Sequence, residues 1–126
     1  MATAVLFLPF PSPKLSPNKK QHPIVLHRLR KQYKTACLWE LKAQGVRPLK
    51  AASASMLITF HPPNANRRDR DNCIGAFKSG QDALAIALGI DDSKFDVSYA
   101  PLATPILPNG QIRVDLNWTP REAKAA

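Results

Sequence analysis

Apolar residues recur along the chain at two spacings, which together predict four strands and two long helices. Short runs of alternating or continuous apolar residues are typical of strands, and they cover residues 4–8, 55–61, 94–99 and 111–118. Apolar positions three and four residues apart instead predict helices from Ile24 to Gln44 and from Asn72 to Leu88, each followed by a glycine. Gly75 and Gly80 weaken the second helix, because a glycine inside a helix costs ~1 kcal/mol relative to alanine.

The order of these elements predicts an α+β fold, with a small mixed β-sheet and two main helices packed on one face. Asn109-Gly110 precedes the last strand, so we expect residues 94–99 and 111–118 to form an antiparallel hairpin. A chain of 126 residues has the usual size of one domain. Residues 1–126 should therefore form a single domain, with residues 119–126 as a frayed tail.

The chain is strongly basic, with 18 Lys and Arg against 9 Asp and Glu and a formal net charge of +9. Such an excess favours a polyanion as partner, most often nucleic acid. No apolar run approaches the ~18 residues that cross a membrane, so a membrane is not an expected partner. Cys37 and Cys73 form no C-x-x-C pair, which predicts two free thiols and a cytoplasmic location.

The acidic residues are unevenly distributed along this basic chain. The first fifty residues contain ten basic side chains and a single acid, Glu40, whereas six acids fall between residues 69 and 96. Carboxylates repel phosphates, so a protein that only binds DNA gains nothing from such a cluster. A metal-dependent nuclease does gain from an acidic cluster, because carboxylates, water and substrate phosphate together bind Mg²⁺. The bound ion then activates the attacking water. The distribution therefore favours Mg²⁺ as a cofactor.

Two acidic pairs are candidate ligands for that ion. In an extended backbone, Asp69 and Asp71 point the same way and can approach one ion, but an isolated D-x-D is more often a helix cap formed by Asp71 or Asn72. Asp91 and Asp92 follow the glycine that ends the second helix, and their ordinary interpretation is a solvated turn. Each pair alone is a weak signal.

A lysine and an acid on the second predicted helix extend the pattern. At about 100° per residue, Lys78 and Asp82 fall within roughly 20° of the same line as Asp71. The functional interpretation has Lys78 facing the scissile phosphate, where it would compensate charge in the transition state. The alternative is an exposed ion pair between Lys78 and Asp82.

In combination, these residues resemble the RusA family of Holliday junction resolvases. The resemblance rests on the run Arg67-Arg68-Asp69-Arg70-Asp71-Asn72, then Lys78, Asp82-Ala83-Leu84 and Gly89-Ile90-Asp91-Asp92. That family shows R-x-D-x-D-N, a helical lysine, D-A-L and a D-D pair in this order. A strand leading into a proline loop, a basic helix, a strand before the D-x-D and a closing hairpin extend the likeness over nearly the whole chain.

The resemblance implies a RusA-like fold and a set of catalytic residues. Asp69, Asp71 and Asp92 would hold Mg²⁺, with Asp91 a weaker candidate for the third position. Lys78 would be the essential lysine, matched through its distance to Asp82, because this chain has a few more residues between Asn72 and the lysine than the family pattern.

The function implied is Mg²⁺-dependent, structure-specific cleavage of DNA that resolves Holliday junctions by paired nicks, in recombination and repair. Each chain has one acidic cluster, so two symmetric cuts require a homodimer on the four-way junction. Basic side chains would hold the junction phosphates; the candidates are Arg67, Arg68, Arg70, Lys19, Lys20, Arg28, Arg30 and Lys31. The alternatives are a non-catalytic basic nucleic-acid-binding module and a small basic RNA-binding protein of the ribosomal kind.

Overall fold

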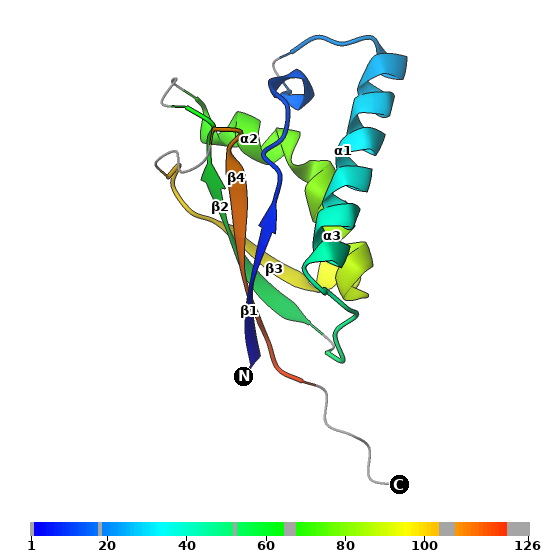
Figure 1. Ribbon diagram of the computed structural model, residues 1–126, viewed down its shortest axis with the longest axis vertical. Coiled ribbons are helices and arrows are strands. Elements are labelled where there is room, and N and C mark those ends of the chain that lie inside the picture. Colours follow the sequence, from blue (N-terminus) through cyan, green and yellow to red (C-terminus); the bar gives the residue numbers. More distant parts are fainter. Residues whose placement is uncertain (1, 18, 52, 65–67, 104–107, 121–126) are drawn as a thin grey trace, which may run out of the picture.

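Four strands form one mixed sheet in the order β1-β4-β2-β3 (Figure 1). The strands are β1 (Ala2–Leu8), β2 (Ala54–His61), β3 (Phe95–Tyr99) and β4 (Gln111–Trp118). β4 lies between β1 and β2 and is antiparallel to both, whereas β3 is parallel to β2. This computed structural model describes residues 2–17, 19–51, 53–64, 68–103 and 108–120.

The predicted hairpin between the last two strands is wrong. β3 lies at one edge of the sheet, and β2 separates it from β4. The reason is the helical connection between β2 and β3, because a strand that returns through a helix pairs in parallel with the strand before it. The turn at Pro108 and Asn109 leads into β4 alone, and Gly110 follows it with a φ of 74°.

Within the described residues, three α-helices complete the fold: α1 (Pro23–Ala43), α2 (Arg70–Ala76) and α3 (Lys78–Leu88). The predicted second helix is therefore two helices, which break at Phe77. The ring of Phe77 is fully buried, and a Cβ on Gly80 would overlap its Cε1 atom. Gly80 thus lowers helix propensity but leaves the space that the Phe77 ring occupies. None of the described helices is long and apolar enough to span a membrane.

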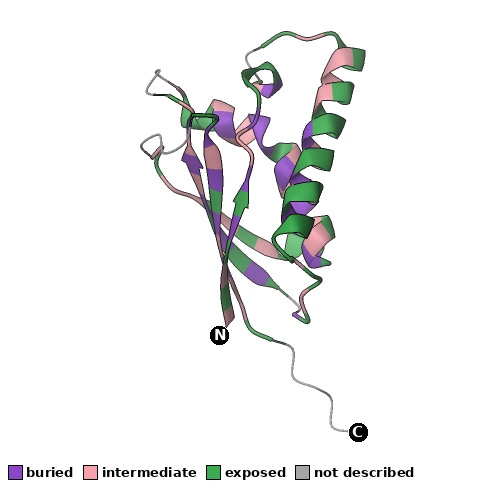
Figure 2. Ribbon diagram, viewed as in Figure 1, coloured by how far each residue is buried: buried purple, intermediate pink, exposed green. Residues whose placement is uncertain are grey.

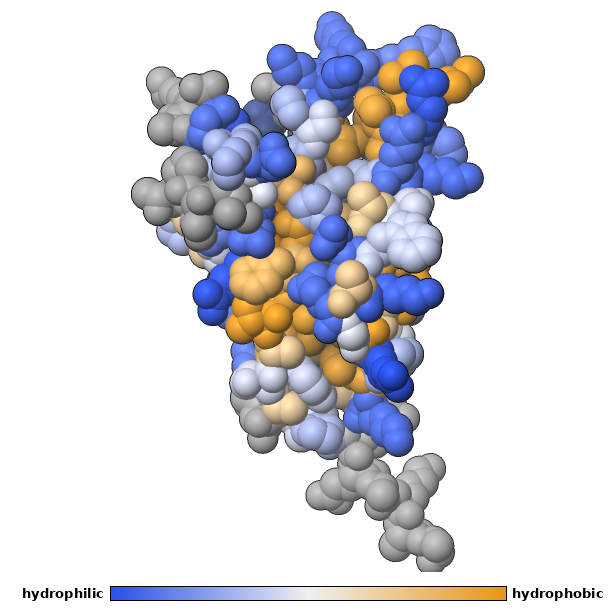
Figure 3. Space-filling model, viewed as in Figure 1, coloured by the Kyte–Doolittle hydropathy of each residue, from blue (hydrophilic) through white to orange (hydrophobic). Residues whose placement is uncertain are grey.

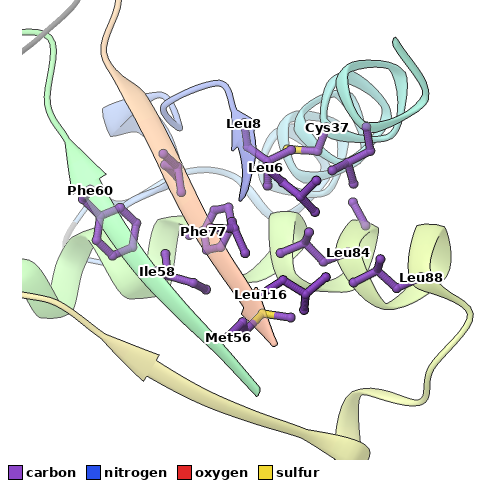
Figure 4. Packing of buried hydrophobic residues seen from close by; sticks show 14 of the residues in the cluster. Leu6, Leu8, Cys37, Met56, Ile58, Phe60, Phe77, Leu84, Leu88 and Leu116 are labelled. Carbon is purple, nitrogen blue, oxygen red and sulfur yellow. The ribbon is translucent and has the colours of Figure 1, made fainter. Parts of the chain in front are cut away.

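Buried residues alternate with exposed ones along the strands and recur along α1 and α3, so one face of the sheet packs against the helices (Figure 2). The predicted α+β fold is confirmed. Side chains from the sheet, α1 and α3 meet in it, as Figure 4 shows for Leu8, Cys37, Ile58 and Leu84. The opposite face of the sheet carries the exposed Val5, Phe7 and Leu57. The predicted tail, residues 119–126, lies mostly outside the described residues.

Candidate functional site

The first turn of α2 places the D-x-D pair. Asp69 is the N-cap, and its Oδ1 accepts a hydrogen bond from the backbone N–H of Asp71 at 2.8 Å. Arg70 and Asp71 are helical, so the expectation of an extended D-x-D is wrong. The alternative of a helix cap is right in kind but wrong in residue, because the cap is Asp69 and not Asp71 or Asn72. Among the described residues, Oδ2 of Asp69 and the exposed carboxylate of Asp71 form no hydrogen bond or ion pair. These oxygens are therefore available to a ligand.

Asp69 lines a pocket with a volume of about 780 Å³. Three loops and one side of the short helix α2 form its walls, and Figure 1 shows these segments together at one end of the sheet. The lining residues are Phe10, Pro11, Ser12, Pro13, Ser16, Lys19, Pro63, Asn64, Arg68, Asp69, Asn72, Cys73, Ala76, Pro108 and Asn109. The sequence patterns singled out few of them, because the loops that contribute them are far apart along the chain.

A hydrogen bond and aromatic contacts hold the proline loop that forms one wall. The buried hydroxyl of Tyr33 in α1 donates to the carbonyl of Pro9 at 2.6 Å. Burial raises the pKa of Tyr33, so this hydroxyl stays protonated and remains a donor. The Phe10 ring packs edge-on against Phe60 at 6.3 Å, and the Arg68 guanidinium lies 5.9 Å from the Phe10 ring centroid. The pocket wall is therefore fixed to the core on one side and to a cation on the other.

The pocket combines a carboxylate with two cationic side chains. Lys19 is exposed, Arg68 is half-buried, and both line the same cavity as Asp69. Arg70 has a different contact, since its Nη1 donates to the carbonyl of Tyr99 at 3.4 Å and joins α2 to the end of β3. Arg67 lies outside the described residues. A cavity with this mixture of charges can accept an anionic group and a metal ion together.

Lys78 does not face this pocket. It is the exposed first residue of α3, beyond the break at Phe77. Because α2 and α3 are separate helices, the prediction that Asp71, Lys78 and Asp82 share one line does not hold. Within the described part of the chain, Lys78 and Asp82 also form no ion pair, so the alternative interpretation fails as well. The catalytic role of Lys78 stays a prediction.

Asp91 and Asp92 lie at the opposite end of the sheet from Asp69. They come just before β3, and Arg70, beside Asp69, contacts the far end of that strand at Tyr99. At ~3.3 Å per residue, the five residues of β3 alone separate the two positions by roughly 13 Å. Ligands of one Mg²⁺ lie only about 2 Å from the ion. One chain therefore does not bring Asp69 and Asp92 around the same ion.

Asp91 has a local role in the turn. Its Oδ1 accepts a hydrogen bond from the backbone N–H of Ser93 at 2.9 Å, which caps the short 3₁₀ helix Asp92–Lys94. This hydrogen bond lowers the pKa of the Asp91 carboxyl. Over the described ranges, no three His, Cys, Asp or Glu side chains are grouped so that they could hold a metal ion. The assignment of Asp92 as a ligand stays a prediction.

The remaining basic candidates are solvent-exposed near the start of α1. Lys20, Arg28, Arg30 and Lys31 are all exposed. Figure 3 shows hydrophilic side chains gathered at this end of the molecule, with apolar ones among them. Lys19, which lines the pocket, and Lys20 lie four and three residues before the start of α1, so basic residues recur along the chain from the pocket wall into this helix.

The chain resembles a protein of Xylella fastidiosa (strain Temecula1 / ATCC 700964). The two are 31% identical over 121 residues, which cover 94% of this chain and 78% of that protein. The two proteins belong to one family. The Xylella relative is itself uncharacterized, so membership of this family assigns no activity. No protein-family model matches the chain.

Proposed function

We propose that this protein is a Mg²⁺-dependent, structure-specific endonuclease that resolves four-way DNA junctions, as RusA-type resolvases do. The observation that carries the proposal is the pocket beside α2, where Asp69 shares one cavity with Lys19 and Arg68. Cationic side chains bind phosphate oxygens, and a carboxylate beside them accommodates a metal ion. The net charge of +9 supports a polyanionic substrate.

The carboxylates at the start of α2 fit a magnesium ion. Mg²⁺ is usually bound through one or two carboxylates, with water and substrate phosphate filling the other positions. Oδ2 of Asp69 and the carboxylate of Asp71 would be those ligands, because neither is engaged within the described residues. When bound, the ion would polarise the scissile phosphate and lower the pKa of the attacking water. Lys19 and Arg68 would orient the phosphodiester.

A homodimer is part of the proposal. Two symmetric nicks require two active sites, which a C₂ pair of chains supplies. Asp92 can approach the ion at Asp69 only from a second chain, since its own chain holds it at the other end of the sheet. We place the reaction in DNA recombination and repair in the cytoplasm, which suits the two buried free thiols Cys37 and Cys73.

The substitution Asp69→Asn tests the proposal without removing the helix cap. Asparagine caps helices about as well as aspartate, so α2 should remain intact while the charge is lost. We expect cleavage of a four-way junction in Mg²⁺ to fall at least ~100-fold, the scale on which active-site electrostatic contacts act. Junction affinity should be kept or increase, because a negative charge beside the phosphates is gone. Asp82→Asn removes an exposed acid outside the pocket and should cleave like the wild type.

Two outcomes would contradict the proposal. If Asp69→Asn cleaves at the wild-type rate, Asp69 holds no catalytic ion. If the wild type binds junctions tightly but cuts none in Mg²⁺, the protein is the alternative candidate, a non-catalytic nucleic-acid-binding module. An EDTA control identifies cleavage that needs no added metal.

A further inference from the structure

The solvent-facing side of α1 carries a continuous stripe of basic residues and one tryptophan. We define the outer stripe of α1 as Arg28, Lys31, Thr35, Trp39 and Lys42, all of which are exposed. At about 100° per residue, these five positions fall within an arc of roughly 80° on one face of the helix. From Arg28 to Lys42 the stripe is about 21 Å long at ~1.5 Å per residue.

Trp39 is the unusual member of the stripe. It is 65% exposed, and the Nζ of Lys42 lies 5.5 Å from the centroid of its ring. Single exposed apolar side chains are common on protein surfaces and need no explanation. Here, however, the indole contacts Lys42, and Arg28 and Lys31 lie further along the same helix face. The large exposed fraction of Trp39 leaves ring surface open even with Lys42 above it. Aromatic rings among cations are typical of surfaces that bind single-stranded nucleic acid.

The fold does not need the outer stripe for packing. The opposite side of α1 already reaches the core through Tyr33, Cys37 and Leu41. At the end of the helix, the Gln44 side chain accepts a hydrogen bond from the backbone N–H of Phe7 at 2.8 Å and donates to its carbonyl at 2.7 Å. α1 is therefore fixed to the core and to β1, and it presents the stripe as a rigid surface.

We propose that the outer stripe of α1 binds unpaired nucleotides, with a base stacked on Trp39 and phosphates held by Arg28, Lys31 and Lys42. Charge complementarity argues for this occupant, because α1 carries five Lys and Arg residues against one acid. A fully paired four-way junction offers no free base to Trp39, so the inference goes beyond the proposed function and adds single-stranded nucleic acid as a ligand. It concerns binding only and does not depend on Asp69 or on a metal ion.

Fluorescence of Trp39 tests the stacking directly. The chain has two tryptophans, so Trp118→Phe leaves Trp39 as the only reporter. Titration with a single-stranded oligothymidylate of about 12 nucleotides should quench its emission in a saturable way at low salt. Binding detected by anisotropy with no change in emission would overturn the proposal.

The same reporter distinguishes other occupants of the stripe. A blue shift with increased emission on phosphatidylserine vesicles, without quenching by the oligonucleotide, would identify a membrane surface instead. A blue shift that depends only on protein concentration would mean that a second copy covers the stripe. Either result would overturn the proposal.

Substitutions at Trp39 separate stacking from simple apolar contact. Trp39→Leu should weaken oligothymidylate binding roughly 5- to 150-fold, the range for losing one stacked base, whereas Trp39→Phe should keep most of the affinity. Ile86→Ala is the matched control, since Ile86 is 55% exposed on the neighbouring α3 and should not affect binding. Circular dichroism should show that all three variants are folded, because both side chains are exposed.

The basic residues of the stripe have their own test. Lys31→Ala should reduce the slope of log K against log salt by about 0.7, the value for one phosphate contact on a single strand. Lys94→Ala removes another exposed lysine, just before β3, and should leave the slope unchanged. If Trp39→Leu binds as the wild type does while Asp69→Asn loses cleavage, the stripe proposal fails and the proposed function stands. If the wild type binds no nucleic acid, both fail.

Discussion

The hydroxyl of Tyr33 donates the hydrogen bond that ties the pocket's proline loop to α1. Tyr33→Phe would remove this bond together with the side-chain hydrogen bond between Tyr33 and Cys37. The ring would keep its edge-on contact with Phe77 at 6.4 Å. The lost bond joins a buried hydroxyl to the carbonyl of Pro9 at 2.6 Å. Removing one partner of a buried hydrogen bond costs about 1–3 kcal/mol. Pro9 is only half-buried, so water can partly satisfy its carbonyl, and we expect a loss of about 1–2 kcal/mol.

Urea denaturation measures this loss, with the midpoint shifted and the slope m unchanged. Tyr99→Phe is the control, because Tyr99 is only half-buried and its ring stacks on Phe60 without holding the proline loop. Tyr33→Phe should also weaken any ligand that binds in the pocket, since Phe10 belongs to the wall that Tyr33 holds. A variant as stable as the wild type would show that packing alone positions the loop, and the reasoning would then be wrong.

Other predictions address the site residues and the buried thiol. Lys19→Ala should lower junction cleavage ~100-fold, because Lys19 lines the pocket. Lys78→Ala tests the family-based assignment in the same assay: a loss of similar size would support it, and a slight effect would refute it. Asp92→Asn should abolish cleavage. Mixing this variant with Asp69→Asn should restore part of the activity, because a mixed dimer assembles one intact site. No recovery on mixing would indicate that Asp92 has a structural role instead. Burial raises the pKa of the Cys37 thiol to about 11, above its usual value near 9. Between these two pH values the thiol stays protonated in the folded state and is ionised in the unfolded state. Through Cys37, the free energy of unfolding should therefore fall from pH 9 to 11 by up to about 1.4 kcal/mol per pH unit, measured by denaturation. Cys37→Ala should weaken the pH dependence but leave the part due to Tyr33, Cys73 and Tyr99, whose pKa values burial also raises.

Periodicity predicted where most elements lie but not how they are joined. The strand at residues 54–61 and the helix at residues 23–43 match their predictions within a residue or two, because burial of one face imposes the spacing of apolar positions. Alternation along β3 determines which side chains face the core, but it is the same for a parallel and an antiparallel neighbour. The break at Phe77 was hidden for a related reason, since apolar spacing continues from α2 into α3.

The candidate site was predictable only in part. The D-x-D marked the start of α2, but whether Asp69 caps the helix or binds an ion depends on backbone angles that the letters do not specify. The pocket joins loops near residues 10, 64 and 109, which only the sheet order brings together. The same order places Asp92 away from Asp69, although the two are close in sequence. The direction of β3 therefore determines that Asp69 and Asp92 lie apart, which the motif alone did not specify.

The central position of β4 has a consequence for how the chain folds during synthesis. β1 is made first, and its partner in the sheet is β4. At ~5–20 residues per second, a ribosome takes roughly 5–20 s to proceed from one to the other. Until then, β1 has no neighbour and β2 exposes the edge that β4 will cover, so both can pair with strands of other nascent chains. The unit β2-α2-α3-β3 can form early, but the four-stranded sheet is complete only when β4 has left the ribosome. A ribosome that stalls before Gln111 would therefore leave an aggregation-prone fragment rather than a smaller stable domain.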